Sequence, residues 1–209
     1  MLPERPVYII DDEPEMCRSL SLLLSTDGVP ARSFGCGELF LDALDQLPPG
    51  ILICDVMMPG ISGIEVTRTV VKRGRTDPVI MIAGHADIPL AVEAMRAGAI
   101  DFIEKPFEAS TILSAIASAR CWPPLHQTDV LAEELPFRER QVLELVVSGL
   151  TSKEIARELD ISPRTVETYR TKLLKKTGAS STAQLIRIGL QAGAGRLSFT
   201  DLGVTNPDE

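Results

Sequence analysis

The stretch ILICDVMMPG, from Ile51 to Gly60, runs through four apolar residues into an acid and then into a proline-glycine turn. A short strand that is apolar at every position is typical of a parallel sheet covered on both faces. In such sheets, ligands bind beyond the carboxyl ends of the strands, at the switch in strand order. Asp55 ends this strand, so we expect its carboxylate at that rim, where it is available for chemistry.

Similar apolar runs recur on both sides of this stretch, and amphipathic stretches alternate with them. The runs predict strands near 7–10, 31–34, 51–54, 79–82 and 101–103. The amphipathic stretches predict helices near 14–26, 37–46, 62–73, 88–96 and 108–120. This alternation predicts an α/β domain built on a doubly wound, five-stranded parallel sheet of the flavodoxin-like type.

The C-terminal part has only helical periodicity. Short helices are predicted near 138–148, 152–159, 163–176 and 181–192. The second and third of these have the helix-turn-helix form, with Ser162 as N-cap and Pro163 at the first helical position. We therefore expect a small all-α domain of four helices.

Two prolines mark the junction between the two patterns. Pro123 and Pro124 forbid helix continuation, and the hydrophobic period is lost around them. We expect a first domain at 4–121, a linker at 122–135, a second domain at 136–195 and a flexible tail at 196–209.

The formal charge of −8 is unevenly distributed. Residues 1–135 hold 20 acidic against 10 basic residues, a charge of −10, whereas residues 136–195 hold 10 basic against 6 acidic residues, a charge of +4. The remaining residues carry −2. Because phosphate neutralisation needs clustered Lys and Arg, this asymmetry points to nucleic acid contacts by the second domain alone.

Composition excludes several other classes. A chain of 209 residues with 44% hydrophobic content accommodates two modest cores. Its apolar runs are far shorter than the roughly 20 residues that span a bilayer, and its N-terminus lacks the order of a signal peptide, so we expect a cytoplasmic protein. The cysteines lack CxxC pairing, which indicates neither a zinc site nor a disulfide framework.

Charged residues end several of the predicted strands. Asp11, Asp12 and Glu13 directly follow the first strand, and Lys105 follows the last strand after a single Glu. Carboxylates gathered at one rim repel one another unless a hard divalent cation joins them, and oxygen ligands suit Mg²⁺. An ionised aspartate beside Mg²⁺ is suited to attack phosphorus, with the metal and a lysine neutralising the phosphoryl oxygens.

Each residue has a simpler explanation when it is taken alone. Asp12 before Pro14 fits the start of a helix, and Asp55 fits a turn former. Lys105 by itself is a solvated lysine, and Phe102 is a core aromatic. Their joint order along the strands favours the shared site.

Several motifs together resemble a known family. They are DDE at 11–13, CDVMMPGISG at 54–63, AGHADIPLAVEAMRAGAIDFIEKPF at 83–107 and LPFRERQVLELVVSGLTSKEIARELDISPRTVETYRTKLLKKTGA at 135–179. The chain resembles a two-component response regulator of the FixJ kind, in which a receiver domain is joined to a LuxR-type helix-turn-helix. The resemblance extends over residues 6–192 and is specific because the motifs occur together.

The resemblance implies a regulator rather than an enzyme. It implies that Asp55 takes a phosphoryl group from a sensor histidine kinase. It also implies a Mg²⁺ site formed by Asp12, Asp55 and the main-chain carbonyl of Met57, with Asp11 assisting through the water shell of the metal.

The switch positions include one departure from the family. The resemblance implies that Lys105 contacts the phosphoryl oxygens and that Phe102 fills the aromatic switch position. Receivers carry Thr or Ser at the end of the fourth strand, where a hydroxyl bonds the phosphoryl oxygen, but this chain has Ala83. The main-chain N–H of Gly84 remains available. A receiver that acts as a phosphate-independent dimerisation module is therefore kept as the alternative.

The second helix of the helix-turn-helix divides into two faces. Helical spacing places on one face Val166, Tyr169, Leu173 and Thr177. The opposite face would enter the major groove of duplex DNA, and it carries Arg164, Glu167, Thr168, Thr171 and Lys175. A merely solvated basic face is the simpler reading.

Roles for individual residues of this domain follow from the resemblance. Base-reading positions are matched by Glu167, Thr168 and Thr171. Phosphate contacts are expected from Lys153, Arg164, Arg170, Lys172 and Lys175. The implied partners are double-stranded DNA, a second copy of the chain on activation or on DNA, and RNA polymerase.

Two enzyme classes fit less well. An aspartyl-nucleophile phosphatase needs a second acid two positions after Asp55, where this chain has Met57. A dinucleotide enzyme needs a glycine-rich turn after the first strand, and the segment DDEPEM has no glycine.

Overall fold

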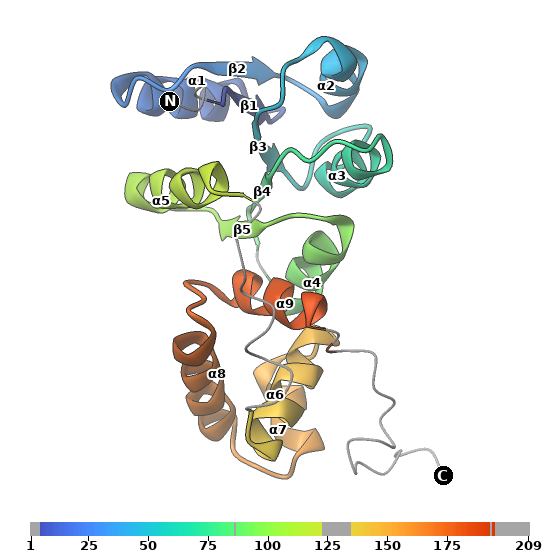
Figure 1. Cartoon of the computed structure of the whole chain (residues 1–209), viewed down its shortest axis with the longest axis vertical. Helices are drawn as coiled ribbons and strands as arrows, with labels where there is room; N and C mark the ends of the chain where they lie inside the picture. Colours follow the sequence, from blue (N-terminus) through green and yellow to red (C-terminus); the bar gives the residue numbers. More distant parts are fainter. Residues whose placement is uncertain (1–4, 86, 123–134, 193, 195–209) are drawn as a thin grey trace. The chain divides into compact units, whose positions relative to one another are not determined.

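The computed structural model describes residues 5–85, 87–122, 135–192 and 194 (Figure 1). The chain forms two compact units. The predicted tail, with its expected flexibility, and most of the predicted linker lie outside the described residues. None of the described helices has the length and apolar character needed to cross a membrane.

The described strands form one parallel sheet in the order β2-β1-β3-β4-β5. They are β1 (Val7–Ile10), β2 (Ala31–Phe34), β3 (Ile51–Asp55), β4 (Val79–Ala83) and β5 (Asp101–Glu104). This is the flavodoxin-like order expected from the sequence. Every residue of β1, β3 and β4 is buried, whereas three of the four residues of β2 are exposed. The edge position of β2 explains why its sequence, ARSF, is the least apolar.

Helices connect the strands close to the predicted positions. They are α1 (Pro14–Thr26), α2 (Gly37–Ala43), the 3₁₀ turn η1 (Leu44–Gln46), α3 (Gly63–Lys72), α4 (Ile88–Ala97) and α5 (Ala109–Arg120). Figure 1 shows α1 and α5 on one face of the sheet and α2 and α3 on the other. The predicted helix at 37–46 differs slightly, because it tightens into the 3₁₀ turn after Ala43.

The two faces of the sheet have different cores. On one face, aliphatic side chains from α1 and α5, including Leu24 and Ile112, pack against Ile9 and Ile53 of the sheet. On the other, Phe40 packs within an aromatic cluster that also contains Tyr8 and Phe34. Burial on both faces fixes the strands, and hence the position of every side chain at their carboxyl ends.

The described residues from 135 onward form α6 (Phe137–Val147), α7 (Ser152–Glu158), α8 (Pro163–Thr177) and α9 (Thr182–Gln191). As predicted, α8 begins with Ser162 as N-cap, whose side chain accepts a hydrogen bond from the amide of Thr165, and with Pro163 in its first turn. Val166 and Leu173 are fully buried. Tyr169 and Thr177, which the sequence placed on the same face, are only half-buried.

Candidate functional site

The carboxyl ends of β1, β3 and β5 bring three charged residues together. Asp55 is the last residue of β3, and Asp11 directly follows β1. Ile10 pairs with Cys54 in the parallel register, so these two acids stand side by side at the rim. Lys105 directly follows β5, and its peptide bond to Pro106 is cis. The shared carboxyl edge of the parallel sheet therefore produces the convergence expected from the sequence, with Lys105 reaching across from β5, two strands from β3.

The ammonium of Lys105 lies among these carboxylates. Its Nζ is 2.7 Å from Oδ1 of Asp55 and 3.2 Å from Oδ2 of Asp11. A third carboxylate, that of Glu13, has its Oε1 at 3.5 Å. Asp11 and Asp55 are buried, at 2% and 6% exposure. Buried charges require a partner, and Lys105 provides one for both acids.

Burial and ion pairing act in opposite directions at this rim. Burial raises the pKa of the Asp11 carboxyl, although the amide of Glu13 and the ammonium of Lys105 act to lower it. Burial lowers the pKa of Lys105, but hydrogen bonds and charge from Asp55 and Asp11 outweigh burial and raise it above its ordinary value. Lys105 is therefore a fixed positive charge facing Asp55.

The two oxygens of Asp55 have different surroundings. Oδ1 faces Lys105, whereas Oδ2 accepts a hydrogen bond of 2.7 Å from the amide of Met57. The side chain of Met57 is 76% exposed, and Asp12 is exposed next to the buried Asp11. The structure thus gathers Asp11, Asp55 and Lys105 closely and leaves Asp12 open to solvent at the edge of the group.

The donor atoms at this rim suit a hard cation. Within the described residues, no three His, Cys, Asp or Glu side chains form a group able to hold a metal ion by themselves. However, the carboxylates of Asp11 and Asp55 both accept a hydrogen bond from the ammonium of Lys105, so their negative charges lie close together. Carboxylates, main-chain carbonyls and water are the ligands that Mg²⁺ prefers. The residues present fit this ion if main-chain and water oxygens complete the set.

Ala83 lies at the end of the fourth strand, as the sequence predicted. It ends β4, is 1% exposed and pairs with Glu104, the residue before Lys105. Its carbonyl accepts a hydrogen bond of 2.8 Å from the amide of Lys105. A Cβ added to the exposed Gly84 would meet nothing within 4 Å, so the space beside this residue is open. Phe102, the expected switch aromatic, is buried in this structure.

Two residues that support the Asp55 loop were not found by sequence reasoning. A Cβ on Gly63 would lie 2.1 Å from the carbonyl oxygen of Asp55, so only glycine fits there. From α2, Oε1 of Glu38 accepts a hydrogen bond of 3.0 Å from the amide of Ile61. The second glycine of PGISG was a signal for the first contact. Nothing local to Glu38 signalled the second.

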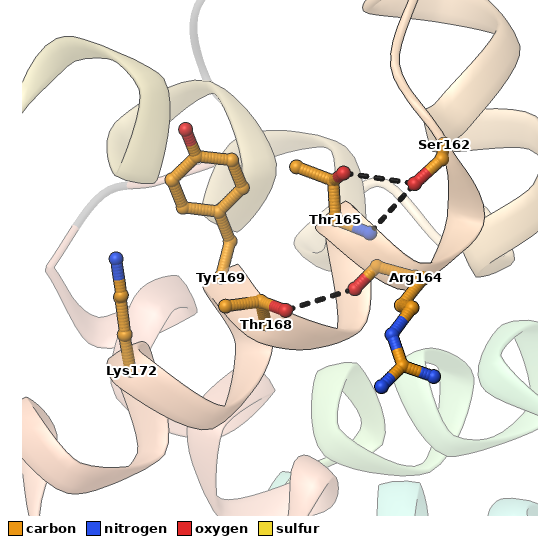
Figure 2. Close-up of a pocket in the computed structure, with 6 residues that line it drawn as sticks. All are labelled: Ser162, Arg164, Thr165, Thr168, Tyr169 and Lys172. Carbon is orange, nitrogen blue, oxygen red and sulfur yellow. Dashed lines mark hydrogen bonds between the residues drawn. The ribbon is translucent and has the colours of Figure 1, made fainter.

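The exposed face of α8 is a second candidate site. As expected, side chains exposed on it include Arg164, Glu167, Thr168, Thr171, Lys172 and Lys175. Lys153 of α7 is also exposed. A shallow hollow of about 390 Å³ lies along the first turns of α8. Figure 2 shows the residues that line it, which are Ser162, Arg164, Thr165, Thr168, Tyr169 and Lys172.

Side chains on this face are held by local contacts. The hydroxyl of Thr168 donates to the carbonyl of Arg164 at 2.9 Å, as Figure 2 shows. Thr171 makes the same contact with the carbonyl of Glu167, also at 2.9 Å. The ammonium of Lys172 lies 5.6 Å from the centre of the Tyr169 ring. The face therefore presents ordered hydroxyl and cationic groups to solvent.

Arg170 differs from the other basic residues of α8. Its side chain is only 13% exposed. Its guanidinium donates to Ser152 at 2.8 Å, to Glu167 at 3.2 Å and to Thr182 at 2.9 Å. These contacts within the unit differ from the phosphate contact that the sequence led us to expect at this position.

Comparisons with known proteins identify a family for each part of the chain. Residues 7–117 match the family model described as response regulator receiver domain, and residues 133–188 match that of bacterial regulatory proteins of the luxR family. Transcriptional regulatory protein FixJ of Bradyrhizobium diazoefficiens is 42% identical over 195 residues, covering 90% of this chain and 95% of the relative. FixJ of Rhizobium meliloti is also 42% identical, covering 90% and 97%.

Solved structures give the same result. The crystal structure of full-length FixJ from B. japonicum is 41% identical and covers 93% of this chain and 99% of that chain, with a TM-score of 0.55. The structure of FixJ-N is 38% identical and covers 60% of this chain and all of that one, also with a TM-score of 0.55.

Proposed function

Because the chain belongs to the FixJ-type response regulators, which join a receiver domain to a LuxR-type DNA-binding domain, we propose that Asp55 is its phosphoryl acceptor. The donor is a sensor histidine kinase, and the phosphorylated receiver controls transcription through the DNA-binding domain. The observation that carries this proposal is the ammonium of Lys105, which lies within hydrogen-bonding distance of both Asp55 and Asp11.

The transfer follows from this geometry. A carboxylate oxygen of Asp55 forms a bond to phosphorus while the bond from phosphorus to the donor imidazole nitrogen breaks, and that nitrogen leaves with the electron pair. The Lys105 ammonium neutralises charge on the phosphoryl oxygens. The amide of Met57 orients the carboxylate through the other oxygen of Asp55.

Receiver domains generally bind Mg²⁺ at the phosphorylation site. In this chain, the residues that would hold it are Asp11 through water, Asp12, Asp55 and the main-chain carbonyl of Met57. When bound, the ion supplies further charge neutralisation for the phosphoryl oxygens. Lys105 already pairs with the two buried acids and offsets the repulsion between them.

A direct test measures the acyl phosphate. The full-length protein is incubated with a small phosphodonor and Mg²⁺, and peptide mass spectrometry locates the added phosphoryl group. We expect it on Asp55, labile to hydroxylamine and absent from Asp55→Asn. Asp45→Asn, at an exposed acid of η1, is the matched control and should be modified normally. Absence of an acyl phosphate on the native protein rejects phosphoryl acceptance.

For DNA, we propose that the exposed face of α8 enters the major groove. Base edges are read by Glu167, Thr168 and Thr171, and phosphates are contacted by Lys153, Arg164, Lys172 and Lys175. The net positive charge of residues 136–195 supports this assignment. Thr171→Ala should relax sequence preference, whereas Lys175→Ala should weaken binding to all duplexes alike and lower the salt dependence. Equal effects of both changes on all sequences would contradict the assignment.

We also propose the domain bounds, the cellular location and the partners of the protein. Residues 4–121 form the receiver, 122–135 the linker and 136–195 the DNA-binding domain. The protein acts in the cytoplasm as a homodimer when activated or bound to DNA, and RNA polymerase is its partner at promoters.

A second function is favoured by one observation. Ala83 supplies no hydroxyl at the end of β4. In this alternative the receiver is a dimerisation module that works without phosphate. Sedimentation of the native protein and of Asp55→Asn, each with and without phosphodonor, separates the two functions. Dimers that persist equally in all four samples support the alternative.

A further inference from the structure

Arg170 connects three of the helices of the DNA-binding domain. From α8, one terminal nitrogen, Nη1, donates to Oγ of Ser152 in the first turn of α7 at 2.8 Å. The other, Nη2, donates to Oγ1 of Thr182 in the first turn of α9 at 2.9 Å. The guanidinium therefore fixes both neighbours of α8 relative to it.

The same guanidinium holds an acid on the exposed face. Nη1 of Arg170 lies 3.2 Å from Oε1 of Glu167, one turn earlier on α8. The hydroxyl of Ser152 donates to this same oxygen. These two contacts fix one oxygen of the Glu167 carboxylate. Because the side chain is 57% exposed, the carboxylate remains accessible to solvent. A long acidic side chain on an otherwise open surface is thus held in one place.

These contacts do not fit a phosphate-binding arginine. With 13% exposure and both terminal nitrogens bonded within the domain, Arg170 is less available to DNA than the exposed cations around it. Lys153, Arg164, Lys172 and Lys175 are exposed and need no such rearrangement. A planar guanidinium also has the fork geometry needed to serve partners on separate helices, whereas a lysine offers one nitrogen.

We propose that Arg170 is a positioning residue for sequence reading: it fixes the carboxylate of Glu167 so that this acid accepts a hydrogen bond from a cytosine amino group in the major groove. Glutamate is suited to cytosine because the N4 amino group is a donor there. The positive charge of Arg170 also offsets the repulsion between Glu167 and the DNA backbone. This inference rests on the proposed function, since it requires α8 to read DNA.

The test uses the full-length protein, with and without phosphodonor and Mg²⁺. Duplexes selected from a random pool define the preferred site. Dissociation constants are then measured for that site, for each single base-pair change and for an unrelated duplex, over a range of salt concentrations. The variants are Arg170→Lys, Arg170→Ala, Ser152→Ala, Glu167→Ala and the double variant Glu167→Ala with Arg170→Lys, with Lys175→Ala as the phosphate-contact control.

Arg170→Lys should lose discrimination at one cytosine position by on the order of tenfold, with its salt dependence unchanged. Ser152→Ala, which removes the other donor to Glu167, should weaken discrimination at the same position. In the Glu167→Ala background, Arg170→Lys should have no further effect there. Circular dichroism checks that each variant is folded, and Ser152→Ala carries the test if Arg170→Lys is not.

Two results overturn the inference. One is an Arg170→Lys variant that keeps native discrimination while Arg170→Ala reduces the salt slope by about one, as a direct phosphate contact requires. The other is a loss at a position that Glu167→Ala does not affect. A native protein that binds no duplex under any condition would reject the proposed function, and this inference with it.

Discussion

Nζ of Lys105 lies 2.7 Å from Oδ1 of Asp55, so the proposed acceptor of a negatively charged group already faces a buried positive charge. The side chain of Lys105 is 16% exposed and that of Asp55 is 7% exposed, which limits screening by water. The pair therefore has two consequences. It lowers the repulsion between Asp55 and Asp11, and it prepares the rim for an incoming phosphoryl group.

Lys105→Met should be destabilising because it leaves Asp11 and Asp55 buried without their cation. We expect the free energy of unfolding to fall by roughly 1 to 3 kcal/mol, as for other buried groups that lose a partner. Urea unfolding measures this loss, and added Mg²⁺ should recover part of it. Lys72→Met, at an exposed position of α3, is the matched control. Equal stability of the two variants would show that the rim acids need no cation.

Gly63→Ala should disturb the acceptor without changing its chemistry. The new Cβ would lie 2.1 Å from the carbonyl oxygen of Asp55, so the loop after β3 must shift. We expect a loss of stability of about 1 to 3 kcal/mol and slower phosphorylation by a small phosphodonor. Gly35→Ala is the control, since a Cβ there meets nothing within 4 Å. Normal phosphorylation of Gly63→Ala would mean that the loop adjusts freely.

Asp12→Ala tests the metal site separately from the fold. Asp12 is exposed, so its removal should cost little stability, and it relieves repulsion with Asp11. Because it is a proposed Mg²⁺ ligand, the variant should lose most of its metal affinity in titration calorimetry. Glu15→Ala, an exposed acid of α1, should bind the metal normally. Native affinity in Asp12→Ala would remove Asp12 from the ligand set.

The capping box of α7 should make stability depend on pH. The hydroxyl of Thr151 and, to a lesser extent, its amide donate hydrogen bonds to Glu154. These bonds hold the pKa of Glu154 below its ordinary value. Because the pKa of Glu154 is lower in the folded state, the stabilisation is complete above the pKa of the unfolded state, ~4.3. It is lost as the pH falls through the pKa of the folded state. The gap in melting temperature between the native protein and Glu154→Gln should therefore close below about pH 4. A gap that stays constant down to pH 3 would contradict this origin.

The sequence predicted the rim well because its geometry follows from strand order. Once ILIC and VYII are neighbouring parallel strands, Asp55 and Asp11 must lie next to each other. Glu38 was missed because its contact with Ile61 joins α2 to a loop 23 residues away, and no local pattern encodes that distance. Such contacts depend on how helices pack, which periodicity alone does not specify.

Arg170 shows a second limit of sequence reasoning. It lies four residues after Val166 and three before Leu173, both fully buried, which is helical spacing for the border of the buried face. The family resemblance, however, led us to expect a phosphate contact there, as for its basic neighbours. The hydroxyls that hold its guanidinium, those of Ser152 and Thr182, come from other helices, and the sequence of α8 does not encode them.

Ala83→Thr addresses the coupling between phosphorylation and DNA binding. Asp55 and Lys105 supply the acceptor and much of the charge stabilisation, so the native protein should still accept phosphate. It lacks a hydroxyl that would favour the active arrangement only when phosphate is present, so we expect the energy that drives the population change to be small. The main-chain N–H of the exposed Gly84 is the other donor that we expect for the phosphoryl oxygens.

We therefore expect phosphodonor to change the DNA affinity of the native protein weakly, and that of Ala83→Thr by about tenfold or more beyond this, the worth of one added hydrogen bond to a charged group. The measurement is the dissociation constant with and without phosphodonor at fixed salt, for both proteins and for each combined with Asp55→Asn. The Asp55→Asn forms should not respond at all. A large response in the native protein that Ala83→Thr fails to exceed would show that Gly84 and Phe102 carry the switch without the hydroxyl.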